Sequence, residues 1–108
     1  MLWYLAHPYS GNEEENLKLS IKRTNILLNH KIMVFNPLTH SHALQLDKAR
    51  KSEFWYDFDL KILKKCVGII FAPKWEQSLG CRLEMKEAMR LGMTPLFYES
   101  VLISLDER

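Results

Sequence analysis

The stretch CVGIIFAPKWEQSLGCRLEMKEAMRLGMTPLFY, residues 66–98, contains the pattern that decides the fold. Residues 67–71 form a short apolar run, rich in β-branched side chains and without a polar face, which is typical of a parallel strand buried on both sides. A loop over residues 72–79 and a helix that ends at Gly92 follow, and residues 94–98 start another strand. The stretch predicts a β-loop-α-β unit whose loop lies at the carboxyl ends of the strands, where such sheets bind their ligands.

The first third of the chain repeats this arrangement. Residues 2–6 predict a strand, a helix is expected to open at the acidic residues 13–15, and residues 32–35 predict the next strand. Two such units within a single domain, residues 1–108, predict an α/β fold. The expected architecture is a small flavodoxin-like or Rossmann-like three-layer sandwich with a parallel sheet of four or five strands.

A flavodoxin-like strand order places the strands at residues 2–6 and 67–71 side by side. The loops that follow these two strands then face each other across the carboxyl edge of the sheet. We therefore expect four residues of the N-terminal segment to lie close to residues 75–84. They are Tyr4, His7, Tyr9 and Ser10.

Residues 36–46, NPLTHSHALQL, are expected to form a long loop that contains two histidines. His40 and His42 are one residue apart, which is compatible with a metal site, but the sequence indicates no third ligand. Histidines near a ligand, or simple surface histidines, are the favoured interpretation, and no metal site is predicted.

A charged, helix-compatible segment then leads into the strand at residues 67–71. Its apolar residues predict a broad buried face: Phe54, Trp55, Phe58, Ile62 and Leu63. Asp59 follows Trp55 by four residues and is expected to reach the ligand edge of the sheet. The alternative is that Asp59 is simply a solvated acid on a helix.

Composition excludes several classes of partner. With 47% hydrophobic and 26% charged residues, the chain is typical of a globular protein with one modest core. The net charge of +2 arises from 15 basic and 13 acidic residues without a basic run, so nucleic acid is not expected as the main partner. No apolar segment approaches the ~20 residues needed to cross a bilayer and no signal peptide is visible, so we expect no membrane association and a cytoplasmic location.

The two cysteines, Cys66 and Cys81, fit that compartment as free thiols. Cys81 is expected on the first turn of a helix, where the helix dipole can lower the pKa of a thiol. A nucleophilic role for Cys81 is therefore an alternative, but a small packed residue is the favoured interpretation.

The loop at residues 72–79 and the helix after it place several polar groups together. Free backbone N–H groups at the helix start bind anions, Gly80 lets a ligand approach the chain, and Glu84 adds an acid about one turn into the helix. A phosphate or a sugar would fit there. The structural alternatives are that Glu84 only stabilises its helix, that Ser78 only caps it, and that Trp75 packs on the core.

Four segments, taken in order, resemble a known superfamily. They are YLAHPYSG at residues 4–11, NPLTHSH at 36–42, FWYDFDL at 54–60 and WEQSLGCRLE at 75–84. Over residues 2–98 the chain resembles the nucleoside 2-deoxyribosyltransferase-like superfamily, which includes deoxynucleotide N-glycosidases and small uncharacterised members.

The resemblance implies an enzyme that cleaves the N-glycosidic bond of a nucleoside or nucleotide and delivers the sugar to water or to another base. It matches the catalytic glutamate of the family to Glu84, the partner aspartate to Asp59, the first-strand tyrosine to Tyr4 and the loop serine to Ser78. It also implies a homodimer or a larger homo-oligomer, and no metal or organic cofactor is expected.

The chemistry of these residue types agrees with that activity. Cleavage passes through an oxocarbenium-like sugar, which a carboxylate such as Glu84 can attack or stabilise while Asp59 assists the leaving base. The expected substrate contacts are Tyr4, His7, Tyr9, Ser10, His42, Trp75, Ser78 and Gly80, with Trp75 and Tyr9 as candidates for stacking on the base. The alternative function is a non-catalytic nucleotide-binding or sensing module of the same fold.

Overall fold

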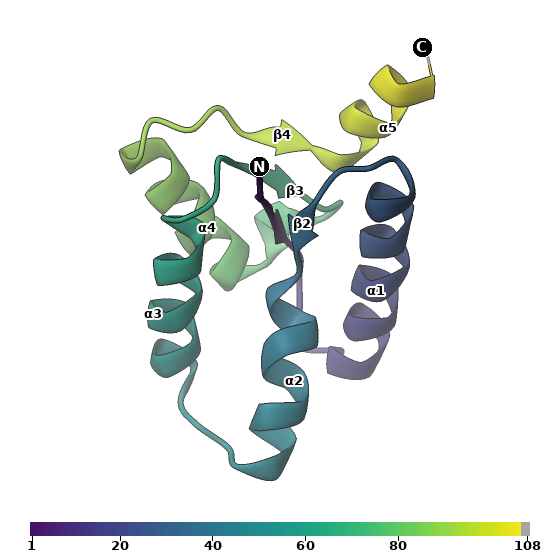
Figure 1. Cartoon of the computed structure of the whole chain (residues 1–108). Coiled ribbons are helices and arrows are strands. Elements are labelled where there is room, and N and C mark those ends of the chain that lie inside the picture. The colour runs from purple at the N-terminus through teal and green to yellow at the C-terminus, as the bar shows by residue number, and fades with distance from the viewer. Residues whose placement is uncertain (107–108) are drawn as a thin grey trace.

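A computed structural model describes residues 1–106 and shows an all-parallel sheet of four strands surrounded by five α-helices (Figure 1). The elements follow one another as β1 (Trp3–Ala6), α1 (Glu13–Asn29), β2 (Val34–Phe35), α2 (Pro37–Asp47), α3 (Ser52–Leu63), β3 (Gly68–Phe71), a 3-10 helix (Trp75–Gln77), α4 (Leu79–Arg90), β4 (Leu96–Phe97) and α5 (Tyr98–Asp106). The strand order β2-β1-β3-β4 is the flavodoxin-like order, so the predicted fold class and the adjacency of β1 and β3 are confirmed.

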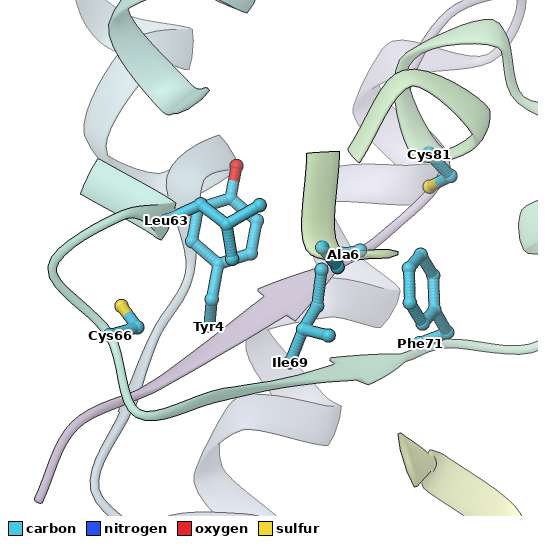
Figure 2. Close-up of a cluster of buried hydrophobic side chains, with 8 residues drawn as sticks. Tyr4, Ala6, Leu63, Cys66, Ile69, Phe71 and Cys81 are labelled. Carbon is cyan, nitrogen blue, oxygen red and sulfur yellow. The ribbon is translucent and has the colours of Figure 1, made fainter. Parts of the chain in front are cut away.

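The sheet separates two apolar clusters because successive side chains of a strand point to opposite faces. On one face, Tyr4, Ala6, Ile69 and Phe71 pack with residues of α3 and α4, including Leu63 and Cys81 (Figure 2). On the other face, Leu5 and Ile70 pack with residues of α1 and α5. These clusters join the sheet to the outer layers of a three-layer sandwich.

In one helix, fewer residues are buried than the periodicity predicted. In α3, Leu63 is fully buried, but Phe54 and Phe58 are exposed, so the predicted buried face was too broad. In α1, the buried positions are Ser20 and Leu27. The polar Ser20 is tolerated there because its hydroxyl donates to a backbone carbonyl and accepts from the Asn36 amide.

The prediction of a loop over residues 36–46 was wrong, because this segment is the helix α2. The Asn36 side chain caps the helix by accepting the backbone N–H of Leu38, and Pro37 occupies the first helical position. The Asn36 amide also donates to Ser20 and Thr24 of α1, at 3.0 Å each. These bonds tie the start of α2 to α1, and the rest of α2 extends beyond the carboxyl edge of the sheet (Figure 1).

The C-terminal part of the chain differs from the prediction at one strand. Gly92 follows α4 with a φ of +76°, a conformation that favours glycine, as its predicted place at the helix end requires. The strand expected over residues 94–98 is the shorter β4, and Tyr98 instead begins α5. Among residues 1–106, no helix combines the length and apolar character that crossing a membrane requires.

Candidate functional site

A cavity of about 710 Å³ opens at the carboxyl ends of β1 and β3, between the loop after β1 and the helices α2, α3 and α4. Most of the predicted site residues line it: His7, Tyr9, Ser10, His42, Asp59, Ser78, Gly80 and Glu84. The predicted approach of the two loops is therefore confirmed. Among the other residues of the cavity wall, which the sequence did not single out as ligand contacts, are Glu14, Arg50, Trp55 and Tyr56.

The floor of the cavity, as we name the Tyr4, Asp59 and Glu84 group, is built on β1, α3 and α4. Tyr4 does not itself line the cavity, so, contrary to the prediction, it is not placed to contact a ligand and instead supports Glu84 from behind. Tyr4 is fully buried, and its hydroxyl donates a hydrogen bond to Glu84 Oε2 across the interface between β1 and α4. Glu84 is 8% exposed, although it belongs to the helix that follows the open loop. The hydrogen bond links two residues that lie 80 positions apart in sequence, and it fixes the Glu84 carboxyl at the cavity wall.

The carboxyl groups of the floor hold their protons unusually tightly. Burial raises the pKa of Glu84 to about 8, the Tyr4 hydroxyl opposes this shift, and the nearby charge of Asp59 adds to it. Burial likewise raises the pKa of Asp59 to about 7. Because the two groups interact, these values describe the pair, which carries about one proton between pH 7 and 8.

Asp59 has an additional property that suits a reactive group. Its Oδ1 atom is buried and has no hydrogen-bond partner within the described residues. A buried polar atom without a partner costs free energy, so a group that a ligand brings to this oxygen gains by bonding it. Asp59 lines the cavity, so a ligand that bound there would lie beside its carboxyl group.

The rim of the cavity, as we name the Tyr9, His42 and Glu14 group, joins the loop after β1 to α2 and α1. The Tyr9 hydroxyl lies 2.6 Å from His42 Nδ1, and His42 Nε2 lies 3.1 Å from Glu14 Oε1. Tyr9 and His42 meet edge to face, with ring centroids 5.8 Å apart. His42 is thus buried at the cavity with both ring nitrogens engaged.

His40, the other histidine of α2, faces a different part of the molecule. Its ring stacks on Phe58 of α3 at a centroid distance of 5.1 Å. No three His, Cys, Asp or Glu residues converge as metal ligands in the part of the chain that the structure describes.

His7 also lines the cavity, but its two nitrogens are engaged by the protein. Nδ1 lies 2.8 Å from the Pro8 carbonyl oxygen and Nε2 lies 2.8 Å from Arg23 Nη1. Because a carbonyl only accepts and a guanidinium only donates, the neutral ring carries its proton on Nδ1. Burial is the main reason why the pKa of His7 is lowered, and Arg23 adds to this effect.

Ser78 and Gly80 begin α4 at the cavity wall. Ser78 Oγ accepts the backbone N–H of Cys81 at 3.2 Å, so Ser78 caps α4. Its hydroxyl proton and second lone pair are not used by this bond, and a contact with a ligand stays a prediction. A side chain at Gly80 would come within 3.2 Å of the Tyr56 ring. Gly80 therefore lets Tyr56 lie against the start of the helix, where both residues line the cavity.

Two predicted candidates do not belong to the reactive part of the site. Trp75 does not line the cavity. Its ring packs on Phe71 and Phe97, with ring centroids 4.9 and 6.1 Å away. This apolar packing next to β4 accounts for its position away from the cavity. Cys81 is buried, and burial together with the charge of Glu84 raises the pKa of its thiol to about 12. The interpretation of Cys81 as a packed residue is confirmed.

A second cavity, of about 640 Å³, adjoins the first and shares Ser10, Tyr56, Ser78 and Gly80 with it. Its wall contains the cations Arg23, Lys74 and Arg82 and a single acid, Glu15. None of the three cations forms an ion pair with a carboxylate within residues 1–106. The carboxyl edge of the sheet thus has an acidic cavity beside a basic one.

The fold and the site define a small α/β protein with a buried carboxyl pair at the switch point of a flavodoxin-like sheet. Residues 2–100 match the family described as Domain of unknown function (DUF1937), and the chain belongs to that family. A search of curated proteins found no match.

Proposed function

We propose that the protein cleaves the N-glycosidic bond of a nucleoside or nucleoside 5′-monophosphate, by hydrolysis or by transfer of the sugar to a second base. The observation that carries the proposal is the buried pair Glu84 and Asp59, with Tyr4 bonded to Glu84, in the wall of a cavity large enough for such a ligand. The resemblance of the four sequence segments to N-glycosidases and deoxyribosyltransferases supports the choice of an N-glycoside over other glycosides.

In the proposed reaction, the Glu84 carboxylate attacks the anomeric carbon while the bond from that carbon to the base breaks. Asp59 donates its proton to the departing nitrogen of the base. Water, or a second base, then attacks the anomeric carbon, Asp59 takes up a proton, and the Glu84 carboxylate is released. This cycle requires the single proton of the pair to lie on Asp59. The pKa values of about 7 for Asp59 and about 8 for Glu84 give one proton near pH 7.5 but place it mainly on Glu84, so the proton must pass to Asp59 before the attack.

The other parts of the site suit the remaining groups of a nucleotide. Trp55 and Tyr56 supply aromatic surface for the base, in place of the Trp75 predicted from the sequence. The basic second cavity and the N-terminus of α4 suit a 5′-phosphate, because Arg23, Lys74 and Arg82 pair with no carboxylate among residues 1–106. A 5′-monophosphate is therefore the favoured substrate form.

The test is chromatographic detection of free base after incubation with a panel of nucleosides and 5′-monophosphates, with and without a second base as acceptor. Free base alone identifies a hydrolase, and a new nucleoside identifies a transferase. The absence of both products across the panel would contradict the proposal.

A non-catalytic nucleotide-binding module is the second candidate. It is favoured by the raised pKa of Glu84, because a carboxyl group with a pKa of about 8 is mostly protonated at pH 7, a form that binds ligands but does not attack them. Nucleotides that raise the melting temperature without any release of base would identify this function.

The proposed enzyme acts as a homodimer or larger homo-oligomer. Exposed apolar side chains of α2 and α3 give this part of the molecule surface suited to association: Leu44, Leu46, Phe54 and Phe58. Light scattering at micromolar concentration is expected to give at least twice the mass of the chain, and the mass of a single chain would contradict this.

A further inference from the structure

The hydrogen bonds of the rim run in one direction, from the Tyr9 hydroxyl to His42 and from His42 to Glu14. An ionised carboxylate only accepts hydrogen bonds, so the Glu14 contact at 3.1 Å requires a proton on His42 Nε2. A neutral imidazole carries one N–H, which leaves Nδ1 as an acceptor. While the ring is neutral, the hydroxyl proton of Tyr9 therefore lies in the 2.6 Å contact with Nδ1.

This direction determines what Tyr9 offers to a ligand. Because its only proton points to His42, the phenolic oxygen retains acceptor capacity and has no proton to donate. Tyr9 lines the cavity, so a ligand group that donates a hydrogen bond can use this oxygen. A ligand group that only accepts finds no partner in it.

The segment around Tyr9 is held in place independently of any ligand. The Asn16 amide donates to the Tyr9 carbonyl at 2.9 Å, and the Glu13 carboxylate accepts the Gly11 backbone N–H at 2.6 Å. On the other side, the cap of α2 at Asn36 fixes the helix that presents His42. A preorganised acceptor discriminates between ligands because it does not turn to suit each of them.

We propose that Tyr9 is a specificity-determining residue that accepts a hydrogen bond from the exocyclic amino group of the substrate base, and that His42 and Glu14 are positioning residues that fix the direction of its hydroxyl. This inference rests on the proposed function, since it names the class of base that the cavity takes: an amino-bearing base of the adenine or cytosine type. It gives Tyr9 a polar role in place of the stacking role expected from the sequence.

The test compares each amino nucleotide with an analogue in which hydrogen replaces the amino group. The pairs are adenosine and purine riboside 5′-monophosphates, and cytidine and pyrimidin-2-one riboside 5′-monophosphates. Dissociation constants are measured by titration calorimetry at pH 8 in a Glu84→Gln background, where turnover is blocked and the introduced amide oxygen still accepts the Tyr4 hydroxyl. In the pair that contains the better ligand, the amino form is expected to bind about fivefold to tenfold more tightly.

Glu14→Gln tests the positioning role, because the side chain is exposed and its replacement leaves the core intact. A glutamine amide can donate to Nε2, which permits the other imidazole tautomer and frees the Tyr9 proton to point to the ligand. The preference for the amino form is then expected to fall to about twofold or less. Glu53→Gln, the same change at an exposed position of α3 that lines neither cavity, is the matched control and should retain the full preference.

Tyr9→Phe should remove the preference entirely by raising the dissociation constant of the amino form alone. Equal binding of both members of each pair would overturn the inference, as would a preference that survives Glu14→Gln or Tyr9→Phe. If nucleotides bind and free base is released without an amino preference, the inference fails and the proposed function stands. If no nucleotide binds and wild-type protein releases no base, both fail.

Discussion

The floor and the rim of the cavity each contain a tyrosine and a glutamate, in opposite surroundings. On the floor, Tyr4 is fully buried and donates to Glu84, which is 8% exposed. On the rim, Tyr9 is linked through His42 to Glu14, whose side chain is 71% exposed. Burial raises the pKa of Glu84 to about 8, whereas the exposed Glu14 serves to orient a ring. The comparison teaches that depth below the surface, and not the presence of a tyrosine nearby, is what raises the pKa of a carboxyl group.

The largest effect expected to distinguish the floor from the rim is the loss of activity in Glu84→Gln. Glutamine retains the shape and the bond from Tyr4, but it cannot form the glycosyl ester. We expect the rate of base release to fall by at least about 10⁴-fold. The measurement is the initial rate of base release on the best nucleotide of the panel.

Glu87→Gln is the matched control, since Glu87 lies one turn further along α4 and pairs with Arg90 on the surface. It should keep wild-type activity. Equal rates for Glu84→Gln and the wild type would refute the assignment of the floor as the reactive group.

The next effect concerns the second carboxyl group. Asp59→Asn removes the acid that protonates the leaving base, so we expect kcat to fall by about 10²- to 10⁴-fold. Asp57→Asn changes an exposed acid of the same helix and should have little effect. A substrate with a better leaving base should recover part of the loss in Asp59→Asn, and failure of such a substrate to do so would argue against the role of Asp59 as the acid.

A smaller effect is expected on stability, and its size depends on pH. The pKa of Glu84 is raised from its ordinary value of 4.5 to about 8 in the folded protein, so the folded state binds this proton more tightly than the unfolded state. The contribution of Glu84 to stability is therefore largest below pH 4.5 and declines as pH rises to about 8. Glu84→Gln should raise the free energy of unfolding by on the order of 2 kcal/mol at pH 8.5 and much less at pH 5. Denaturant unfolding at both pH values measures this, and a loss of stability at pH 8.5 would be the contrary result.

The sequence predicted the floor better than the rim because strong local patterns position the floor. The apolar run of β3, the capped start of α4 and Gly92 locate Glu84, and the flavodoxin-like order brings Tyr4 to it. Asp59 was identified from its spacing after Trp55 together with the family resemblance, which matched it to the partner aspartate. The pKa of Glu84 could not be predicted, because it depends on the packing of three elements around one side chain.

The rim depends on α2, which was mistaken for a loop. Its sequence has little apolar periodicity, and Leu44 and Leu46 remain exposed in the structure, so no buried stripe indicated a helix. The cap formed by Asn36 and Pro37 was the available signal. Without the helix, the sequence could not show that His42 turns toward Tyr9.

Trp75 shows a different limit of the sequence. A tryptophan in a loop at the ligand edge suggests base stacking, but its ring packs on Phe71 and Phe97. Whether the Trp75 ring packs on the core or faces the cavity depends on where β4 lies. The local sequence does not show the position of β4.

The pH dependence of base release tests most directly the central claim, that Glu84 and Asp59, carrying one proton between them, perform the cleavage. With the pKa of Asp59 at about 7 and that of Glu84 at about 8, we expect kcat/KM of the wild-type protein to follow a bell with its maximum between these values. The rate should fall at lower pH, where both groups are protonated, and at higher pH, where both are ionised. A rate that does not change between pH 5 and 10, or the absence of base release at every pH, would contradict the account.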